Sequence, residues 1–281
     1  MSLMKCDPVN YYSLILLRIY VHIFNISKHK LPFIYIKHRD GQPKDDGLAD
    51  IWFVGFIATF FGVGIGGVLS YFINGFKRSI GTIYAMCTGL ILGLMSFEIA
   101  PEAIRLGNWL VLSLGFIAGI ILFKLIHAIL ETQLHKRPDL KSGLLLTLII
   151  SIHNFPIGVI LGTSEKSDLS ISLLQTLILH NIPEGMILFT LLFIAGFRFL
   201  PLLLLSFIVA IPVAAGALLG EMIGTEHHLL WAFLLSLTVG TIYMVTMKEI
   251  LPEARKHSSK AYSLLVTVIA FCLIGAYVIY L

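Results

Sequence analysis

The sequence is poor in charge. Only 13% of its 281 residues are Asp, Glu, Lys or Arg, whereas soluble domains carry about 25%. Hydrophobic residues make up 57% of the chain, and the mean hydropathy is +0.91. This composition excludes an ordinary soluble domain and predicts an all-α polytopic membrane protein, with the lipid bilayer as its surroundings. The net charge of +4 is spread over loops, so a nucleic-acid partner is not indicated.

Cysteine is also scarce. The three cysteines, Cys6, Cys87 and Cys272, are far apart and form no CxxC pair. They therefore provide no disulfide framework. Cys87 and Cys272 lie in apolar runs and are expected to be packing residues.

A clean signal peptide is missing from the N-terminus. The apolar run 11–25 is interrupted by Arg18 and His22, and no small-residue cleavage site follows it. We expect residues 1–48 to form an N-terminal extension, either interfacial or disordered. Residues 49–281 are expected to form the membrane domain.

Eight apolar runs are long enough to cross a bilayer, which requires roughly 20 residues per helix. Basic residues in short loops favour the cytoplasmic side. Nine of them lie in one alternating set of loops (77, 78, 136, 137, 141, 198, 255, 256 and 260) and two in the other (105 and 166). This bias predicts a cell-membrane protein with both termini extracytoplasmic. The runs are 50–74, 81–104, 108–130, 142–163, 168–195, 199–223, 228–252 and 260–281.

The chain contains an internal repeat. SFEIAPEAIR at 96–105 aligns without gaps with MKEILPEARK at 247–256, an offset of 151 residues. In the predicted topology these helices run in opposite directions, so the repeat is inverted, as is typical of transporters. It predicts a 3+2+3 arrangement of helices.

The central pair of predicted helices carries two related polar motifs. SIHNFPIG contains His153 and Asn154, and LHNIPEG contains His180, Asn181 and Glu184. Ionisable residues at such a depth are costly and indicate function. His180 and Glu184 share a helical face, because residues four apart project about 40° from one another. If His153 faces them, the set is two histidines and one carboxylate, which suits Zn²⁺ and other first-row divalent ions.

Each motif also contains a proline inside the predicted helix. Pro156 and Pro183 have no N–H and crowd the carbonyls of Ile152 and Leu179. Freed carbonyls at membrane depth are tolerated where they face protein or a water-filled cavity. The prolines therefore favour an opening beside each histidine.

These motifs, the PEA-ended helices and the eight-span layout resemble the ZIP family of zinc–iron permeases, in its bacterial branch. The resemblance covers about residues 50–281. It implies a metal site between the fourth and fifth helices, formed by His153, Asn154, His180, Asn181 and Glu184. It further implies uptake of a divalent metal into the cytoplasm, and homodimerisation.

The chain departs from the family pattern at two positions. Many members have an acidic residue four after the fourth-helix histidine, where this chain has Ile157, and a glutamate on the sixth helix, where it has Val213. These carboxylates can build a second, bridged metal site. We therefore expect one central metal site rather than two.

Other charged residues at the ends of the repeat helices are candidates for a metal pathway. Glu98 and Glu102 are expected nearer the outer mouth, and Glu249, Glu253 and His257 nearer the inner mouth. Hydrated helix-end charge is the alternative interpretation for all of them.

The sequence thus predicts a transporter rather than an enzyme. It needs no cofactor, and its substrate is expected to be Zn²⁺, with Fe²⁺, Mn²⁺, Co²⁺ and Cd²⁺ as alternatives. A metal-binding receptor or regulator that does not transport remains a second hypothesis. An intramembrane metalloprotease is disfavoured, because such enzymes use HExxH and the residue after His180 is Asn181.

Overall fold

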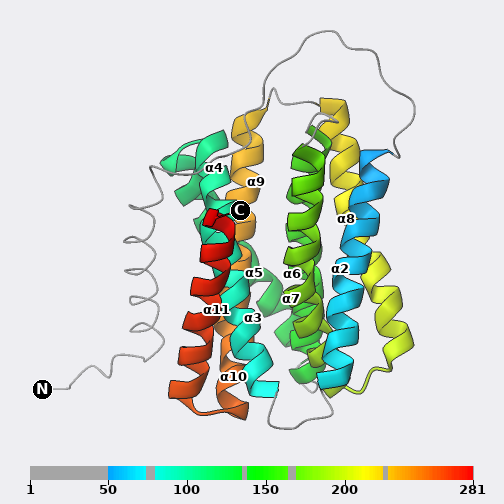
Figure 1. The fold of residues 1–281 in the computed structure, drawn as a ribbon, viewed down its shortest axis with the longest axis vertical. Coiled ribbons are helices and arrows are strands. Elements are labelled where there is room, and N and C mark those ends of the chain that lie inside the picture. Colours follow the sequence, from blue (N-terminus) through cyan, green and yellow to red (C-terminus); the bar gives the residue numbers. More distant parts are fainter. Residues whose placement is uncertain (1–49, 74–79, 135–137, 164–168, 224–226, 281) are drawn as a thin grey trace, which may run out of the picture.

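A computed structural model describes residues 50–73, 80–134, 138–163, 169–223 and 227–280. Over these residues the chain is helical, without strands, and eight helices are long and apolar enough to cross a membrane. Figure 1 shows them as an elongated bundle. Their bounds are α2 (Ile51–Ile73), α3 (Ile80–Leu94), η1 (Met95–Ile99), α4 (Ala100–Leu106), α5 (Trp109–Leu134), α6 (Pro138–Thr163), α7 (Leu169–Ile194), α8 (Phe199–Ile223), α9 (His228–Val245), η2 (Thr246–Ile250), α10 (Leu251–His257) and α11 (Lys260–Tyr280).

The predicted all-α polytopic architecture is confirmed. Each apolar run corresponds to one membrane-length helix or to a helix continued through a π segment, with ends close to those predicted. The 3+2+3 grouping stays a prediction, as does the orientation. The N-terminal extension 1–48 lies outside the described residues.

Two spans contain a π-helical turn, which the sequence did not lead us to expect. In η1 the Ala100 N–H donates to the Met95 carbonyl, and in η2 the Leu251 N–H donates to the Thr246 carbonyl. Each π turn precedes a proline, Pro101 or Pro252, which lacks the N–H of the next α-helical bond. The two π turns lie 151 residues apart, so the internal repeat extends to this local geometry.

The helices pair in a pattern that follows the repeat. α2 packs extensively against α7 and α8 against α6, while α3 packs against α11 and α5 against α9. In the α2–α7 and α6–α8 contacts the helix backbones lie close together. A Cβ on Gly185 would lie 2.3 Å from the Val63 carbonyl oxygen, and a Cβ on Gly158 would lie 2.2 Å from that of Val213. The glycine that ends each HN motif thus allows α2 or α8 to approach closely.

This contact gives a prediction with a matched control on one helix. A Cβ on Gly66 would lie 2.2 Å from the Ile182 carbonyl oxygen, whereas a Cβ on Gly64 would have nothing within 4 Å. We expect Gly66→Ala to destabilise the protein by about 1–3 kcal/mol through overpacking. Gly64→Ala should leave the stability unchanged or raise it slightly. Thermal unfolding in detergent measures both, and equal melting temperatures would contradict the close α2–α7 contact.

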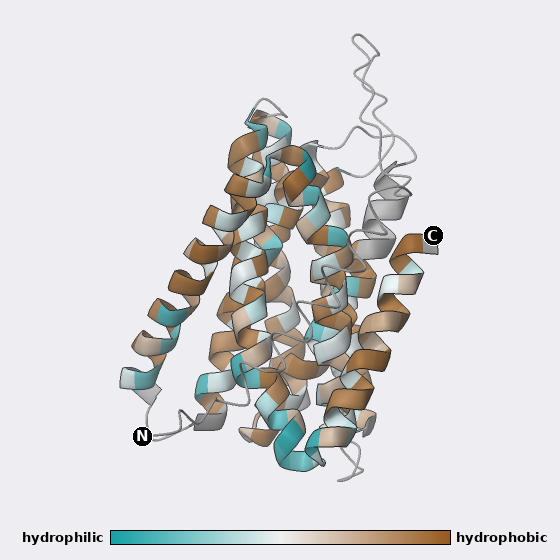
Figure 2. Ribbon diagram, turned by 90° about the vertical axis from the view of Figure 1, so that its left-hand side faces the viewer, coloured by the Kyte–Doolittle hydropathy of each residue, from teal (hydrophilic) through white to brown (hydrophobic). Residues whose placement is uncertain are grey.

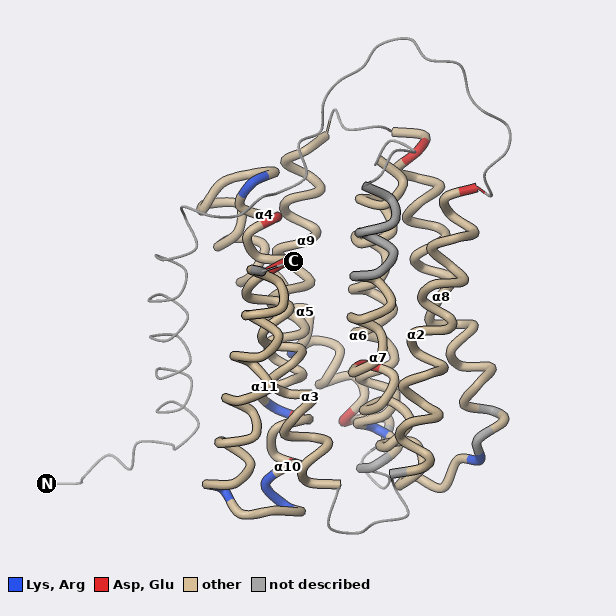
Figure 3. The backbone as a smooth tube through the Cα atoms, viewed as in Figure 1, with Lys and Arg blue, Asp and Glu red and all other residues tan. Residues whose placement is uncertain are grey.

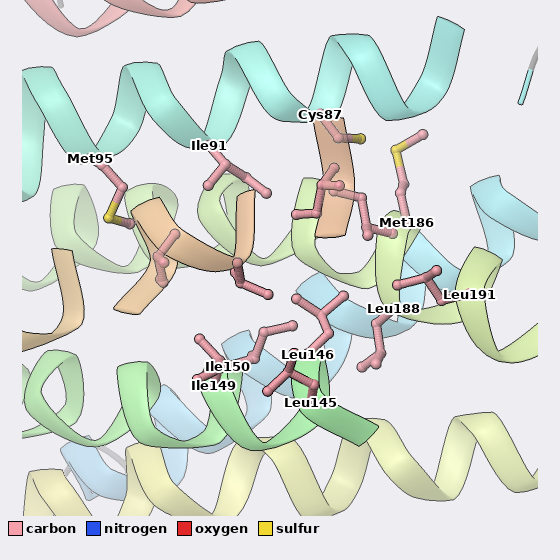
Figure 4. Packing of buried hydrophobic residues seen from close by; sticks show 14 of the residues in the cluster. Cys87, Ile91, Met95, Leu145, Leu146, Ile149, Ile150, Met186, Leu188 and Leu191 are labelled. Atoms are coloured by element: carbon pink, nitrogen blue, oxygen red, sulfur yellow. The ribbon is translucent and has the colours of Figure 1, made fainter. Parts of the chain in front are cut away.

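The largest apolar core contains buried side chains from α3, α6, α7 and α9. Figure 4 shows Cys87 and Ile91 on α3 facing the side from which Leu146 and Ile149 of α6 project, with Met186 of α7 near Cys87. The outward faces of the bundle are also apolar (Figure 2), and many large hydrophobic side chains there are exposed. Such a surface fits a lipid environment.

Charged residues are sparse along the helices, and most of them lie toward the helix ends (Figure 3). The exceptions include three carboxylates within spans, Glu98 in η1, Glu184 in α7 and Glu249 in η2. Each of these contacts a histidine. The histidine–carboxylate pairs are therefore the features that the fold positions inside the bundle.

Candidate metal site

The two HN motifs lie near the middles of α6 and α7, which are consecutive helices in contact with one another. Pro156 and Pro183 lie inside these helices, as predicted. Both helices continue through their prolines. Each proline removes one backbone hydrogen bond, because it has no N–H, but it does not end the helix.

The five candidate metal residues are almost completely buried. Their exposed fractions are 1% for His153, 1% for Asn154, 5% for His180, 1% for Asn181 and 4% for Glu184. Buried polar groups are normally hydrogen-bonded. Nevertheless His153 Nδ1, Asn154 Oδ1, Asn181 Oδ1 and Glu184 Oε2 have no hydrogen-bond partner among the described residues. The lone pairs of these atoms are therefore available to bind a metal ion or water.

The structure brings the site residues together as two pairs. His153 Nε2 lies 3.5 Å from Glu184 Oε1, and His180 Nδ1 lies 3.6 Å from Glu98 Oε2. The two imidazole rings adjoin, with centroids 6.4 Å apart. Over the described residues, no three His, Cys, Asp or Glu side chains are close enough to hold one ion as they stand. Binding an ion between the pairs would need the side chains to turn toward each other.

Each asparagine is anchored through its amide nitrogen. Asn154 Nδ2 donates to the Val209 carbonyl on α8 at 3.0 Å, and Asn181 Nδ2 donates to the Leu177 carbonyl on its own helix at 2.6 Å. The amide oxygens are left as acceptors without a donor. They can serve either as neutral oxygen ligands or as acceptors from water bound to an ion.

Glu98 lies closer to the site than the sequence suggested. We expected it nearer the outer mouth, as a candidate for the metal pathway. It contacts His180 instead, and its side chain is 19% exposed. Glu98 lies within the η1 π turn, and π turns inside α-helices are frequent at functional sites.

Two carboxylates at the ends of the repeat helices form ion pairs within their own helices. Glu102 is paired with Arg105, and Glu253 with Lys256, at repeat-equivalent positions. His257 Nε2 lies 3.8 Å from Glu253 Oε2. Ion pairs near the surface contribute little energy, and a metal pathway through these residues stays a prediction.

Glu249 belongs to a second cluster that sequence reasoning missed in part. Ser142 Oγ donates to Glu249 Oε2 at 2.6 Å, and His127 Nε2 lies 3.5 Å from Glu249 Oε1. Neither Ser142 nor His127 was a candidate. His127 could have been recognised as an ionisable residue within the apolar run of α5, whereas the hydroxyl of Ser142 gave no comparable signal.

The two family-divergent positions are apolar in their surroundings as well. Val213 is fully buried in a small cluster with Ala58, Leu161 and Leu177. Ile157 is half-buried and packs against this cluster and against the main core. Neither side chain can contribute a donor atom to an ion.

Comparison with known proteins gives two matches. A family described as ZIP zinc transporter matches residues 131–281. The chain is also similar to an Arabidopsis thaliana protein that is named as a zinc transporter, with 27% identity over 208 residues. That alignment covers 70% of this chain and 33% of the relative, so the chain spans about a third of the length of the curated relative it matches.

Proposed function

The chain belongs to the ZIP zinc transporter family, and from that premise we propose that it carries a divalent metal ion, zinc, across a membrane. The ion would bind between α6 and α7. His153, His180 and Glu184 would supply the main ligands, with Asn154 and Asn181 as neutral oxygen donors or as orienting groups.

One observation carries this proposal above the others. Two histidine–carboxylate pairs lie side by side at mid-span, with buried donor atoms that the described protein does not satisfy. Leaving such groups unpaired costs roughly 1–3 kcal/mol each. A bound cation would offset that cost, because it accepts electron pairs from the same atoms.

Transport requires no covalent chemistry in this mechanism. The ligands replace the hydration shell of the ion, and access alternates between the two sides of the membrane. Binding must be weak enough for the ion to leave again. The two halves of the inverted repeat provide the symmetry that such alternation uses.

The direction of transport rests on the distribution of basic residues in the loops. The rule that places them in the cytoplasm puts both termini outside. We propose uptake across the cell membrane into the cytoplasm. Zinc is the proposed ion because two imidazoles with carboxylate oxygen form a ligand set that it accepts, although other first-row divalent ions accept the same set.

Flux through purified protein in proteoliposomes tests the proposal. We expect zinc added outside to reach a zinc-sensitive dye trapped inside, and empty liposomes to give the background. Competition by Fe²⁺, Mn²⁺, Co²⁺ and Cd²⁺ would rank the ions. Tight zinc binding without flux would overturn transport and indicate a metal-binding receptor.

A further inference from the structure

Glu98 reaches the central site from a third helix. It lies in η1, between α3 and α4, and its carboxylate contacts the His180 imidazole of α7. The glutamate of the HNIPEG motif makes the corresponding contact with His153 of α6. The site thus contains two pairs of the same composition, each one imidazole and one carboxylate.

The nitrogen–oxygen distance within each pair fits two atoms that share an ion, and the two pairs would have to turn toward each other to share the same one. Hydrogen bonds from nitrogen to oxygen have donor–acceptor distances of about 2.7–3.2 Å. Two donor atoms bound about 2.0–2.2 Å from one tetrahedral ion lie roughly 3.3–3.6 Å apart. The observed separations are 3.5 and 3.6 Å, which are long for hydrogen bonds.

A divalent ion at this site needs a second carboxylate to balance its charge, and α6 does not supply one. With Glu184 as the only carboxylate, a bound divalent ion would leave one net positive charge among buried side chains. Uncompensated buried charge is strongly unfavourable. At position 157, one turn after His153, this chain has isoleucine packed against apolar residues, so the second carboxylate has to come from another helix.

We propose that Glu98 is a ligand of the transported ion and completes a four-residue site with His153, His180 and Glu184. The inference rests on the proposed function, because it assigns a further ligand at the same site. Glu98 takes the role that a carboxylate at position 157 would otherwise have.

The repeat-equivalent residue, Glu249, does not have this role in the described structure. Its two carboxylate oxygens face Ser142 and His127. The π turns therefore present two equivalent glutamates to different surroundings, and Glu98 is the one that meets a histidine of the HN motifs.

Zinc titration of the purified full chain, followed by calorimetry, tests the assignment. We expect Glu98→Gln to weaken zinc binding by about 100-fold or more, because losing a group that only supports a metal site already costs about 10–100-fold. Glu221→Gln makes the same change at an exposed carboxylate on α8 and should bind zinc like the wild type. Adding Ile157→Glu to Glu98→Gln should restore most of the affinity, because it returns a carboxylate to the face of His153.

Thermal unfolding of the metal-free variants separates ligation from packing. Wild-type affinity in Glu98→Gln would overturn the assignment. So would a loss of affinity that follows a lower melting temperature and is not recovered by Ile157→Glu, since Glu98 would then be structural. Zinc flux through the wild type decides the proposed function separately, because the titration measures binding alone.

Discussion

Zinc uptake into proteoliposomes is expected to fall to the level of empty liposomes when His180 or Glu184 is replaced by alanine. Each substitution removes a proposed ligand that is at least 95% buried, where water cannot easily replace it. Loss of a group that only supports a metal site already costs about 10–100-fold in affinity or activity. Loss of a direct ligand should cost more.

The control for these variants is His228→Ala, which removes an exposed imidazole at the start of α9. It should transport zinc at the wild-type rate. All three variants should elute from size-exclusion chromatography as the wild type does. Normal uptake by both His180→Ala and Glu184→Ala would exclude the central site.

These variants should remain folded for a physical reason. Removing one partner of a buried pair is strongly destabilising when it leaves a buried charge without compensation. Glu184→Ala removes the carboxylate but leaves the His153 imidazole, which is uncharged in its ligating form. The loss of transport would therefore reflect the missing ligand rather than unfolding.

The number and approximate bounds of the spans could be predicted from the sequence, because lipid imposes one simple requirement. Each span needs about 20 apolar residues, and the polar loops between them are short. The HN motifs could be recognised for the converse reason. A histidine or glutamate within an apolar run stands out against its neighbours.

The contacts of Glu98 could not be predicted in the same way. Its sequence position places it near the end of an apolar run, and the sequence does not show which helix packs beside it. Glu98 lies in the π turn at Met95–Ile99, and the hydrophobic pattern of the sequence does not predict such a turn. Prolines follow both π turns, yet Pro156 and Pro183 lie in helices without one.

The pairing of Glu249 with His127 and Ser142 was hidden for a different reason. These residues come from η2, α5 and α6, so the contact depends on how three helices pack. Sequence periodicity gives the face of each helix, but it does not give the neighbour of that face. The same limit applies to the paired arrangement at the centre, where convergence of three ligands was expected and two adjoining pairs are found.

One central ion per chain is the second large expected result. A bridged two-ion centre needs carboxylates that lie between the ions, and the positions that could supply them on α6 and α8 are Ile157 and Val213. The Val213 side chain is fully buried among apolar residues, and its carbonyl oxygen lies against Gly158. Zinc titration with elemental analysis should therefore give one tightly bound ion per chain. Two central ions in anomalous scattering would contradict the prediction.

A glutamate at position 157 and a glutamate at position 213 should affect folding differently. Ile157→Glu places a carboxylate on the face of His153 at a half-buried position, and the variant should fold and still bind one ion. Val213→Glu places a carboxylate among Ala58, Leu161 and Leu177, where an unpaired charge costs several kcal/mol. We expect it to lower the melting temperature of the metal-free protein sharply. A Val213→Glu variant that is as stable as the wild type and binds a second ion would show that the missing carboxylate alone limits this chain to one.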